Sequence, residues 1–280
     1  MDTLSPAVDK LAISANTFFN GTLCGTSPFD GAPGPGHLHY LQAGTLRALI
    51  GEHESVTVTG PCAILVLPAV EHRLEASAAD GAMLVCAELG LGAGAANALP
   101  LGIPNPLIVP TAKAPGLEAT LDTLFDEAAA ERQGHLAATN RLMDLLLVLL
   151  LRYCLDTHRL QPGLLAGLAH PQLAPSLLAM HSTPAGTWTL ESLAGVALMS
   201  RARFAAHFKD TVGVPPGEYL TSLRISLAQD ALRQGRPLKS VARTVGYANA
   251  TALARAFKQK TGNSPRAWLA AQAYAVSQRA

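Results

Sequence analysis

Side chains that can hydrogen-bond to nucleic acid gather in two short segments within the last hundred residues of this 280-residue chain. Both segments place such side chains at the start of a predicted helix, with basic residues further along one side. Arginine and asparagine can contact base edges in a DNA major groove, whereas lysine and helix N-termini bind phosphates. The residues that we predict to contact DNA are Ser200, Arg201, Arg203, His207, Asn249, Ala250, Thr251, Arg255 and Lys258.

The first segment has the pattern of two helices joined by a short turn. Thr189 is the predicted N-cap of the leading helix, and Met199 with Ser200 forms the turn and caps the second helix. Phe204 and Phe208 are spaced i, i+4, so both point inward and leave the basic residues on the exposed side. A helix with such an outer face can lie in a major groove.

The second segment repeats this design further along the chain. Leu253 and Phe257 repeat the i, i+4 pair, and Gly246 supplies the backbone freedom of a tight turn. Both segments end alike, at 211–215 (Thr-Val-Gly-Val-Pro) and 261–265 (Thr-Gly-Asn-Ser-Pro). A helical bundle with exposed lysines would explain one such segment. Two in tandem favour a pair of helix-turn-helix motifs that reach successive major grooves.

The charge distribution also indicates a polyanionic partner. Residues 182–280 contain 13 Lys and Arg against 4 Asp and Glu, and residues 1–181 contain 8 against 16, although the formal net charge is only +1. A basic third beside an acidic remainder is typical of nucleic-acid binding, with a solubilising surface as the alternative. We therefore predict double-stranded DNA as a partner.

These motifs resemble the DNA-binding domain of AraC/XylS transcription regulators over about residues 170–270. The resemblance rests on Val245-Gly-Tyr247, on Ala256-Phe-Lys258, and on the stretches 261–268, 197–201 and 204–209. It implies a sequence-specific transcription regulator, with RNA polymerase as a partner. The chain departs from the family at 248–253, where serines and an aromatic residue at the position of Leu253 are usual.

Residues 37–89 have the pattern of short strands separated by turns. The predicted strands are 37–41, 46–50, 55–59, 63–67 and 83–89, with a turn at Ala43-Gly44 between the first two. Short, regularly spaced strands favour a small barrel or sandwich. This region resembles the cupin-type sensor domains that are often joined to AraC/XylS DNA-binding domains.

Histidines in these strands resemble the metal motifs of cupins. His37-Leu-His39 resembles the first motif and residues 68–72 (Pro-Ala-Val-Glu-His) the second, and strand alternation puts His37 and His39 on one face. The ligands that the resemblance implies are His39, His72 and Cys86, with His37 and Cys24 as further ligands. Imidazole and thiolate suit zinc or another transition metal. Histidines with a purely structural role are the alternative.

The same motifs argue against catalysis. Cupin oxygenases carry an acidic ligand a few residues after the histidine pair, but Gln42 and Thr45 stand near that place in this chain. We therefore expect a protein that is not an enzyme, and a cupin enzyme fused to a DNA-binding domain is the weaker alternative.

Cysteines offer a second sensor chemistry. Cys24, Cys62, Cys86 and Cys154 are too widely spaced for a zinc ribbon. The surroundings of Cys24 and Cys86 resemble those in reactive-chlorine-sensing regulators of enteric bacteria, which implies that these two thiols are oxidised, with Cys24 ahead of the barrel. Cys62 and Cys154 fit buried apolar positions. Control by cysteine oxidation is the leading hypothesis, with a metal or a small molecule as alternatives.

Two predicted helices follow the strands, at 117–130 and 136–155. The stretch Leu142–Leu155 is apolar nearly all round, so it must pack inside the protomer or across a homodimer, which we favour. The expected fold is α+β, with a cupin-like β-barrel at 1–112, a helical linker and dimerisation segment at 113–168, and an all-α double helix-turn-helix domain at 169–280.

Membrane insertion is not expected. The longest uncharged apolar run, Leu145–Leu151, is too short to cross a bilayer. The first residues lack a basic region leading into an apolar one, so we predict no signal peptide and a cytoplasmic location.

Overall fold

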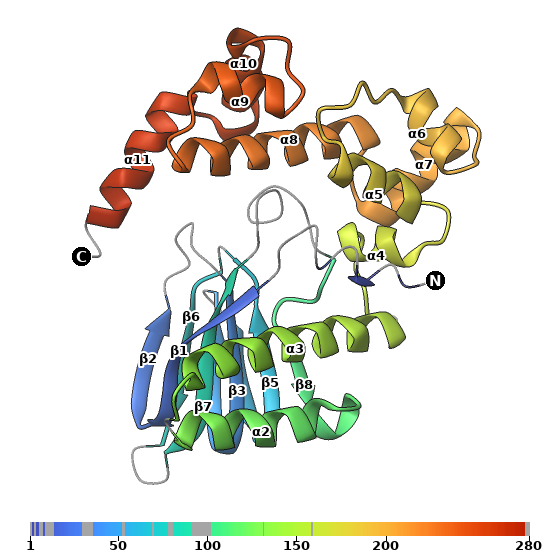
Figure 1. Cartoon of the computed structure of the whole chain (residues 1–280). Coiled ribbons are helices and arrows are strands. Elements are labelled where there is room, and N and C mark those ends of the chain that lie inside the picture. Colours follow the sequence, from blue (N-terminus) through green and yellow to red (C-terminus); the bar gives the residue numbers. More distant parts are fainter. Residues whose placement is uncertain are drawn as a thin grey trace. The chain divides into compact units, whose positions relative to one another are not determined.

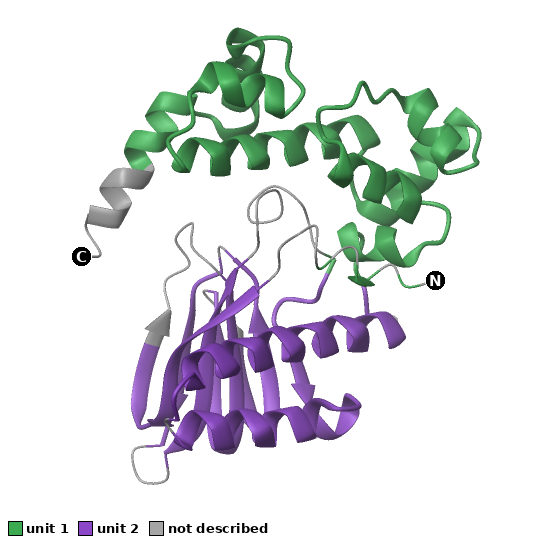
Figure 2. Ribbon diagram, viewed as in Figure 1, with its two compact units in different colours: residues 1–11, 92–102, 161–280 green, residues 12–91, 103–160 purple. Residues whose placement is uncertain are grey.

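The structure is a computed structural model that describes residues 2, 4–5, 8, 14–29, 36–51, 54–68, 70–77, 81–90, 102–130, 132–157 and 159–277. The chain forms two compact units (Figure 2). Residues 12–91 and 103–160 form the barrel unit, and residues 1–11, 92–102 and 161–280 form the helical unit. The predicted α+β class, with a β-rich first part and a helical last part, is confirmed. Ala69, inside the second predicted metal motif, lies outside the described residues.

The barrel unit is built on antiparallel strands. Within the described residues these are β1 (Ser14–Leu23), β2 (Gly25–Phe29), β3 (Gly36–Ile50), β4 (Glu54–Thr59), β5 (Cys62–Val66), β6 (His72–Ala76), β7 (Ala82–Gly90) and β8 (Leu107–Pro110). One layer has the order β1-β7-β3-β5-β8, while β2 pairs with β6, and β3 pairs with both β4 and β6. The sequence did not predict β1, β2, β6 and β8.

Strand β3 links the two layers of the barrel unit. Its first part pairs with β5 and β7, and its second part pairs with β4 and β6. The register with β7 shifts between Leu41 and Ala43, and Gly44 has a φ of +92°. The turn predicted at Ala43-Gly44 is therefore wrong, because a bulge bends one continuous strand there instead of ending it.

Two helices cover the β1-β7-β3-β5-β8 layer (Figure 1). They are α2 (Leu117–Ala130) and α3 (His135–Asp156), which follow the short 3₁₀ helix η1 (Thr111–Lys113). Side chains of α3 also accept hydrogen bonds from backbone N–H groups of β1. Asp144 accepts one from the backbone N of Ala15 (2.8 Å), and Asn140 accepts one from the backbone N of Thr17 (3.0 Å). Both predicted helices are confirmed.

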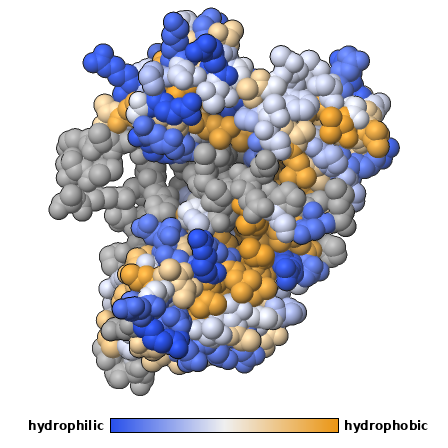
Figure 3. All heavy atoms as spheres, viewed as in Figure 1, coloured by the Kyte–Doolittle hydropathy of each residue, from blue (hydrophilic) through white to orange (hydrophobic). Residues whose placement is uncertain are grey.

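Most of the apolar stretch of α3 packs inside the protomer. Its buried residues from 142 onward are Met143, Leu146, Leu147, Leu149, Leu150, Leu151, Tyr153 and Cys154. Two leucines of this helix remain outside, because Leu136 is 63% exposed and Leu145 is 45% exposed. In Figure 3 apolar residues gather over α3 on the face in view. Among the described residues, no helix is long and apolar enough to cross a membrane.

Within its described residues, the helical unit contains a short helix, α4, followed by two three-helix modules that one long helix joins. Its helices are α4 (Leu164–Ala169), α5 (Ala174–Ser182), α6 (Leu190–Val196), α7 (Arg201–Val212), α8 (Pro216–Arg233), α9 (Leu238–Thr244), α10 (Ala250–Thr261) and α11 (Pro265–Ser277). We call α5–α7 the first module and α9–α11 the second module. Helix α8 runs from one to the other (Figure 1).

Each module has its own core around α8. The ring of Tyr219 in the first half of α8 lies 5.6 Å from that of Phe208 in α7. The second half of α8 contributes Ile225 and Leu232 to a cluster with Leu253 and Phe257 of α10. The predicted inward-facing pairs are therefore confirmed as core residues.

Candidate DNA interface and sensor site

Helices α6 and α7 form the first helix-turn-helix. Thr189 and Ser192 make a capping box at the start of α6, because each side-chain oxygen accepts a hydrogen bond from the other residue's backbone N. The Oγ of Ser200 accepts a hydrogen bond from the backbone N of Arg203 at 3.4 Å and caps α7. The predicted caps Thr189 and Ser200 are confirmed.

Helices α9 and α10 form the second helix-turn-helix. Gly246 has a φ of +87°, a conformation that residues with a Cβ rarely adopt, so the predicted tight turn is confirmed. Asn249 caps α10, since its Oδ1 accepts a hydrogen bond from the backbone N of Ala252 at 2.8 Å. In the first module the corresponding turn contains Leu198, a non-glycine residue at φ +53° that is 88% exposed.

The two recognition helices match position by position. Phe204 and Leu253 are each the fourth residue after the N-cap, Phe208 and Phe257 are each the eighth, and all four side chains are fully buried. Each helix ends at a left-handed glycine. Helices of equal length with the same buried face present the same outer face, which is what two copies of one DNA-reading element require.

Most of the residues predicted to contact DNA lie on these outer faces. The exposed members of the set are Ser200, Arg201, Arg203, Asn249, Thr251, Arg255 and Lys258, and Ala250 is half-buried. Ser200 and Asn249 also cap their helices, so a contact with DNA would add to a structural role that each already has. No arginine or lysine in this set is buried.

His207 differs from the exposed position expected for it. Its side chain is half-buried, and its Nε2 lies 2.8 Å from Nε2 of His170, which follows α4. The backbone N of Gln172 donates to Nδ1 of His170 at 3.3 Å, so neutral His170 carries its proton on Nε2 and donates it to His207. Burial lowers the pKa of His170, and His207 and Arg203 lower it further. Sequence reasoning missed His170 because this contact joins distant segments.

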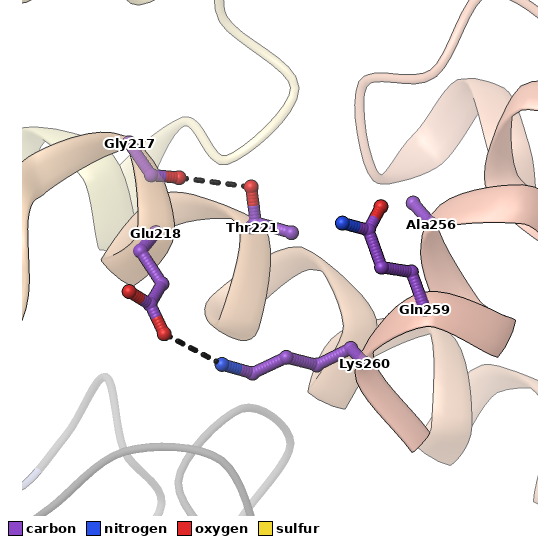
Figure 4. Close-up of a pocket in the computed structure, with 6 residues that line it drawn as sticks. All are labelled: Gly217, Glu218, Thr221, Ala256, Gln259 and Lys260. Carbon is purple, nitrogen blue, oxygen red and sulfur yellow. Dashed lines mark hydrogen bonds and ion pairs between the residues drawn. The ribbon is translucent and has the colours of Figure 1, made fainter. Parts of the chain in front are cut away.

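The flank of α10 that corresponds to the His207 side of α7 lines a cavity. A cavity of about 680 Å³ lies between Gly217, Glu218 and Thr221 of α8 and Ala256, Gln259 and Lys260 of α10 (Figure 4). Nζ of Lys260 lies 3.1 Å from Oε1 of Glu218, and both side chains are solvent-accessible. An ion pair so exposed to solvent adds little stability. It does join the first turn of α8 to the end of α10.

His39 and His72 face each other inside the barrel unit. Both side chains are buried, and their Nε2 atoms lie 2.9 Å apart. Nδ1 of His72 donates a hydrogen bond to the carbonyl oxygen of Val70 at 3.3 Å, so the Nε2 of neutral His72 keeps a lone pair. That lone pair accepts the proton on Nε2 of His39. The ring of His37 lies 5.1 Å from the ring of His72 and 5.8 Å from that of His39.

The surroundings keep these imidazoles neutral near pH 7. Burial lowers the pKa of His39 well below its ordinary value, and the nearby His72 and His37 act in the same direction. Burial lowers the pKa of His72 to about 4, although the hydrogen bond to Val70 opposes this and His37 adds to it. Neutral imidazole is the form that binds metal ions.

Cys86 shares this site, whereas Cys24 does not. Cys86 is the register partner of His39 on the neighbouring strand, and it is buried. Cys24 is exposed and lies between β1 and β2, so the prediction that it precedes the barrel is wrong. It lies beside Gly81, because its Sγ is 3.2 Å from the point where a Gly81 Cβ would stand.

The strand register separates the two predicted sensor thiols. Leu23 pairs with Ala82 and Phe19 with Cys86, so Cys24 and Cys86 lie roughly five residues, or about 16 Å, apart along the strands. A disulfide needs Cα atoms within about 7 Å. Burial also raises the pKa of the Cys86 thiol, which disfavours the reactive thiolate. The two thiols therefore cannot bond in this arrangement.

The histidine pair offers part of a metal site. The hydrogen bond from Nδ1 of His72 to a backbone carbonyl is the arrangement that orients metal-bound imidazoles. Within the residue ranges that the structure describes, however, no three His, Cys, Asp or Glu side chains are placed to hold a metal ion. His39 and His72 fit as two ligands, and a third would require Cys86 or His37 to move toward them.

Comparisons with known proteins match both units. A family model described as Helix-turn-helix domain matches residues 193–271, and one described as Cupin matches residues 2–156. The chain is 28% identical over 232 residues to RclR of Escherichia coli (strain K12), named an RCS-specific HTH-type transcriptional activator, and the match covers 81% of each chain. A solved structure of ToxT from Vibrio cholerae, bound to an unsaturated fatty acid, has a TM-score of 0.42 at 13% identity and covers 92% of this chain and 93% of that one.

Two further relatives match a shorter part of the chain. Proteins described as AraC-like transcription regulators, from Streptomyces antibioticus and Streptomyces lividans, are 48% and 49% identical over 104 residues, which is 37% of this chain. This chain spans about a third of the length of those two relatives. Together with the two matched family models, these relatives show that the chain has an N-terminal domain of the cupin family and an AraC-type helix-turn-helix domain.

Proposed function

We propose that this protein is a transcription regulator that binds its operator DNA by placing α7 and α10 in successive major grooves of one duplex, a role that needs no catalysis. The observation that carries the proposal is the match between the two helices, which bury side chains at the same two positions, begin at a side-chain N-cap and end at a left-handed glycine. Arg201 and Arg203 at the start of α7, and Thr251 and Arg255 on α10, are exposed and can reach base edges. Lys258 supplies a contact to phosphate.

The experiment is a selection of DNA sites by the full chain. Duplexes with a random central region are enriched on the protein, and the recovered operator is expected to contain two sequence blocks about one helical turn apart. Arg203→Ala should relax the preference in one block and Arg255→Ala in the other. A single block, or the loss of the same block in both variants, would contradict the proposal.

Control of DNA binding is proposed to begin at Cys24. Its exposure makes it the cysteine that a dissolved oxidant reaches first, and the relative RclR is named as specific for RCS. A disulfide with Cys86 would need the end of β1 that precedes Cys24 to part from β7, because the register holds the two thiols apart. Oxidation would therefore be coupled to a rearrangement of the barrel unit, which is what a switch requires.

A transition metal such as zinc is the second candidate effector, and the His39–His72 pair favours it. Metal analysis of reduced protein, followed by mass spectrometry of the thiols after substoichiometric hypochlorous acid, separates the two candidates. Near-stoichiometric metal that disappears in His39→Ala and His72→Ala supports the metal. Absence of metal together with early modification of Cys24 supports direct oxidation. If neither result is found, we would assign control to a small molecule in the barrel.

Partners of the regulator are proposed to include RNA polymerase and a second copy of the chain. The exposed Leu145 on α3 supports the homodimer, because a large apolar side chain on a helix surface favours burial against a partner. Sedimentation at micromolar concentration should give a dimer, and a monomer would contradict this assembly.

A further inference from the structure

Arg224 lies at the midpoint of α8, where the helix passes from the first module to the second. Tyr219, earlier in α8, packs against Phe208 of the first module. Ile225, the residue after Arg224, already belongs to the core of the second module. Arg224 is half-buried, and burial lowers the pKa of its guanidinium. It has no place among the predicted DNA contacts, and its position points to a different role.

The guanidinium binds two carbonyl groups of the first module. Nε of Arg224 donates to the carbonyl oxygen of Pro184 at 2.7 Å, and Nη2 donates to that of Gly186, also at 2.7 Å. These carbonyls belong to the connection between α5 and α6. The indole of Trp188 donates to the carbonyl of Thr183 at 2.8 Å and holds the same connection closed. A planar guanidinium can bind two acceptors at once, which an ammonium group on a lysine stem cannot do with the same geometry.

The same guanidinium contacts the turn of the second helix-turn-helix. Its Cζ lies 5.9 Å from the centre of the Tyr247 ring, a cation–π distance. At Gly246, a Cβ would stand 2.7 Å from Cα of Ala185 and 3.0 Å from Cζ of Arg224. The α5–α6 connection of the first module and the α9–α10 turn of the second module are therefore in direct contact. Arg224 lies against both.

We propose that Arg224 is a positioning residue that holds the two helix-turn-helix modules at one separation and so restricts the protein to operators with one spacing between their two sequence blocks. The inference rests on the proposed binding of α7 and α10 to successive grooves. Its physical basis is that each half of α8 packs into the core of a different module. At the middle of the helix, Arg224 contacts the α5–α6 connection of the first module and Tyr247 of the second. Loss of the guanidinium leaves the carbonyls of Pro184 and Gly186 without their partner and lets the modules move relative to each other.

The test uses the full chain and the operator recovered by selection, together with versions in which one base pair is added or removed between the blocks. One base pair moves the second block by about 3.4 Å and turns it by roughly 35°. The wild type should bind the altered spacings at least about thirtyfold more weakly than the selected one. Arg224→Ala should lose about tenfold in affinity for the operator with the selected spacing. Its affinities for the three spacings should differ by no more than about threefold.

Arg233→Ala is the matched control, because this arginine lies on the same helix but contacts Asp230 and the ring of Trp268, within α8 and the second module. It should keep the wild-type dependence on spacing. Arg224→Lys should behave like Arg224→Ala, since the lysine keeps the charge and loses the two-carbonyl geometry. A folded Arg224→Ala that discriminates spacings as the wild type does overturns the inference.

Tyr247 provides a second route if Arg224→Ala lacks a cooperative unfolding transition. Tyr247→Ala removes the ring that the guanidinium faces and should weaken the discrimination between spacings, whereas Tyr247→Phe should retain it. Equal discrimination in both Tyr247 variants overturns the inference. A wild type that binds all three spacings with equal affinity overturns the proposed two-groove binding itself. That outcome is distinguishable from the one expected for the inference, in which only the variants lose the discrimination between spacings.

Discussion

His207 in α7 and Ala256 in α10 occupy the same place in the two recognition helices, the seventh position after the N-caps Ser200 and Asn249. In the first module the imidazole of His207 fills this place and pairs with His170. In the second module Ala256 leaves the place open and lines the cavity beside the Glu218–Lys260 ion pair. Equivalent flanks of the two matched helices therefore differ, because a histidine pair fills one and a cavity borders the other.

This relationship predicts that His207 acts through His170. His170→Ala and His207→Ala should each lower the stability of the helical unit by about 1 kcal/mol, and the double variant should lose little more than either alone. If His207 has no direct contact with DNA, both single variants should weaken operator binding equally. Urea unfolding and gel-shift titration measure the two effects. A much larger loss of binding in His207→Ala than in His170→Ala would show that His207 also touches DNA.

Arg203 and Lys258 should differ in the kind of binding that they provide. Arg203→Ala should cost about 1–3 kcal/mol on the operator and relax the sequence preference at one block. Lys258→Ala should weaken binding to every sequence alike and flatten the dependence on salt, because a phosphate contact releases a counterion. Titrations on operator and random DNA at several salt concentrations distinguish them. Wild-type binding by Arg203→Ala would contradict the recognition face assigned to α7.

The cysteines should react in an order set by exposure. Cys24 is exposed, whereas burial raises the pKa of Cys62 and of Cys154 to about 11 and raises that of Cys86 further. The thiolate is the reactive form, so at neutral pH an alkylating reagent should modify Cys24 first and the other three only on unfolding. Mass spectrometry against time gives the order. Cys24→Ser should abolish the response to hypochlorous acid, while Cys62→Ser should retain it.

The helical unit should lose stability in acid through His181. Burial lowers the pKa of His181 to about 4 from the ordinary 6.5, and its Nε2 lies 2.6 Å from the hydroxyl of Tyr219. Because the unfolded chain takes up the proton more readily, the unfolding free energy should be unaffected above pH 6.5 and fall as the pH drops toward 4. His181→Gln removes this titration and should flatten the fall. Tyr219→Phe leaves the imidazole in place and serves as the control, and equal pH slopes in both variants would contradict the assignment.

Leu145 should decide whether α3 mediates assembly. It is 45% exposed on a helix whose leucines from 146 to 151 are all buried, so Leu145→Glu should leave the fold intact and convert a dimer into a monomer. Arg141→Glu is the control for a change of charge on the same helix. Sedimentation of the three proteins gives the answer, and an unchanged dimer in Leu145→Glu would place the interface elsewhere.

The sequence by itself determined the features that depend on near neighbours in the chain. Caps such as Thr189 and Ser200, the inward pair Phe204 and Phe208, and the turn at Gly246 follow from side-chain type and from spacings of a few residues. The limits of α2 and α3 followed from helical periodicity in the same way. These signals are local, so one chain sufficed to predict two helix-turn-helix motifs and the class of the fold.

Only the tertiary structure decided which distant residues meet. The bulge that carries β3 through Ala43, the strand register that separates Cys24 from Cys86, and the pairing of His207 with His170 all depend on contacts between remote segments. Arg224 gave no signal of its own, because an arginine in an amphipathic helix has the same local pattern whether it faces water or binds two carbonyls of another module. Periodicity fixes the face on which a side chain lies, and packing alone fixes what that face touches.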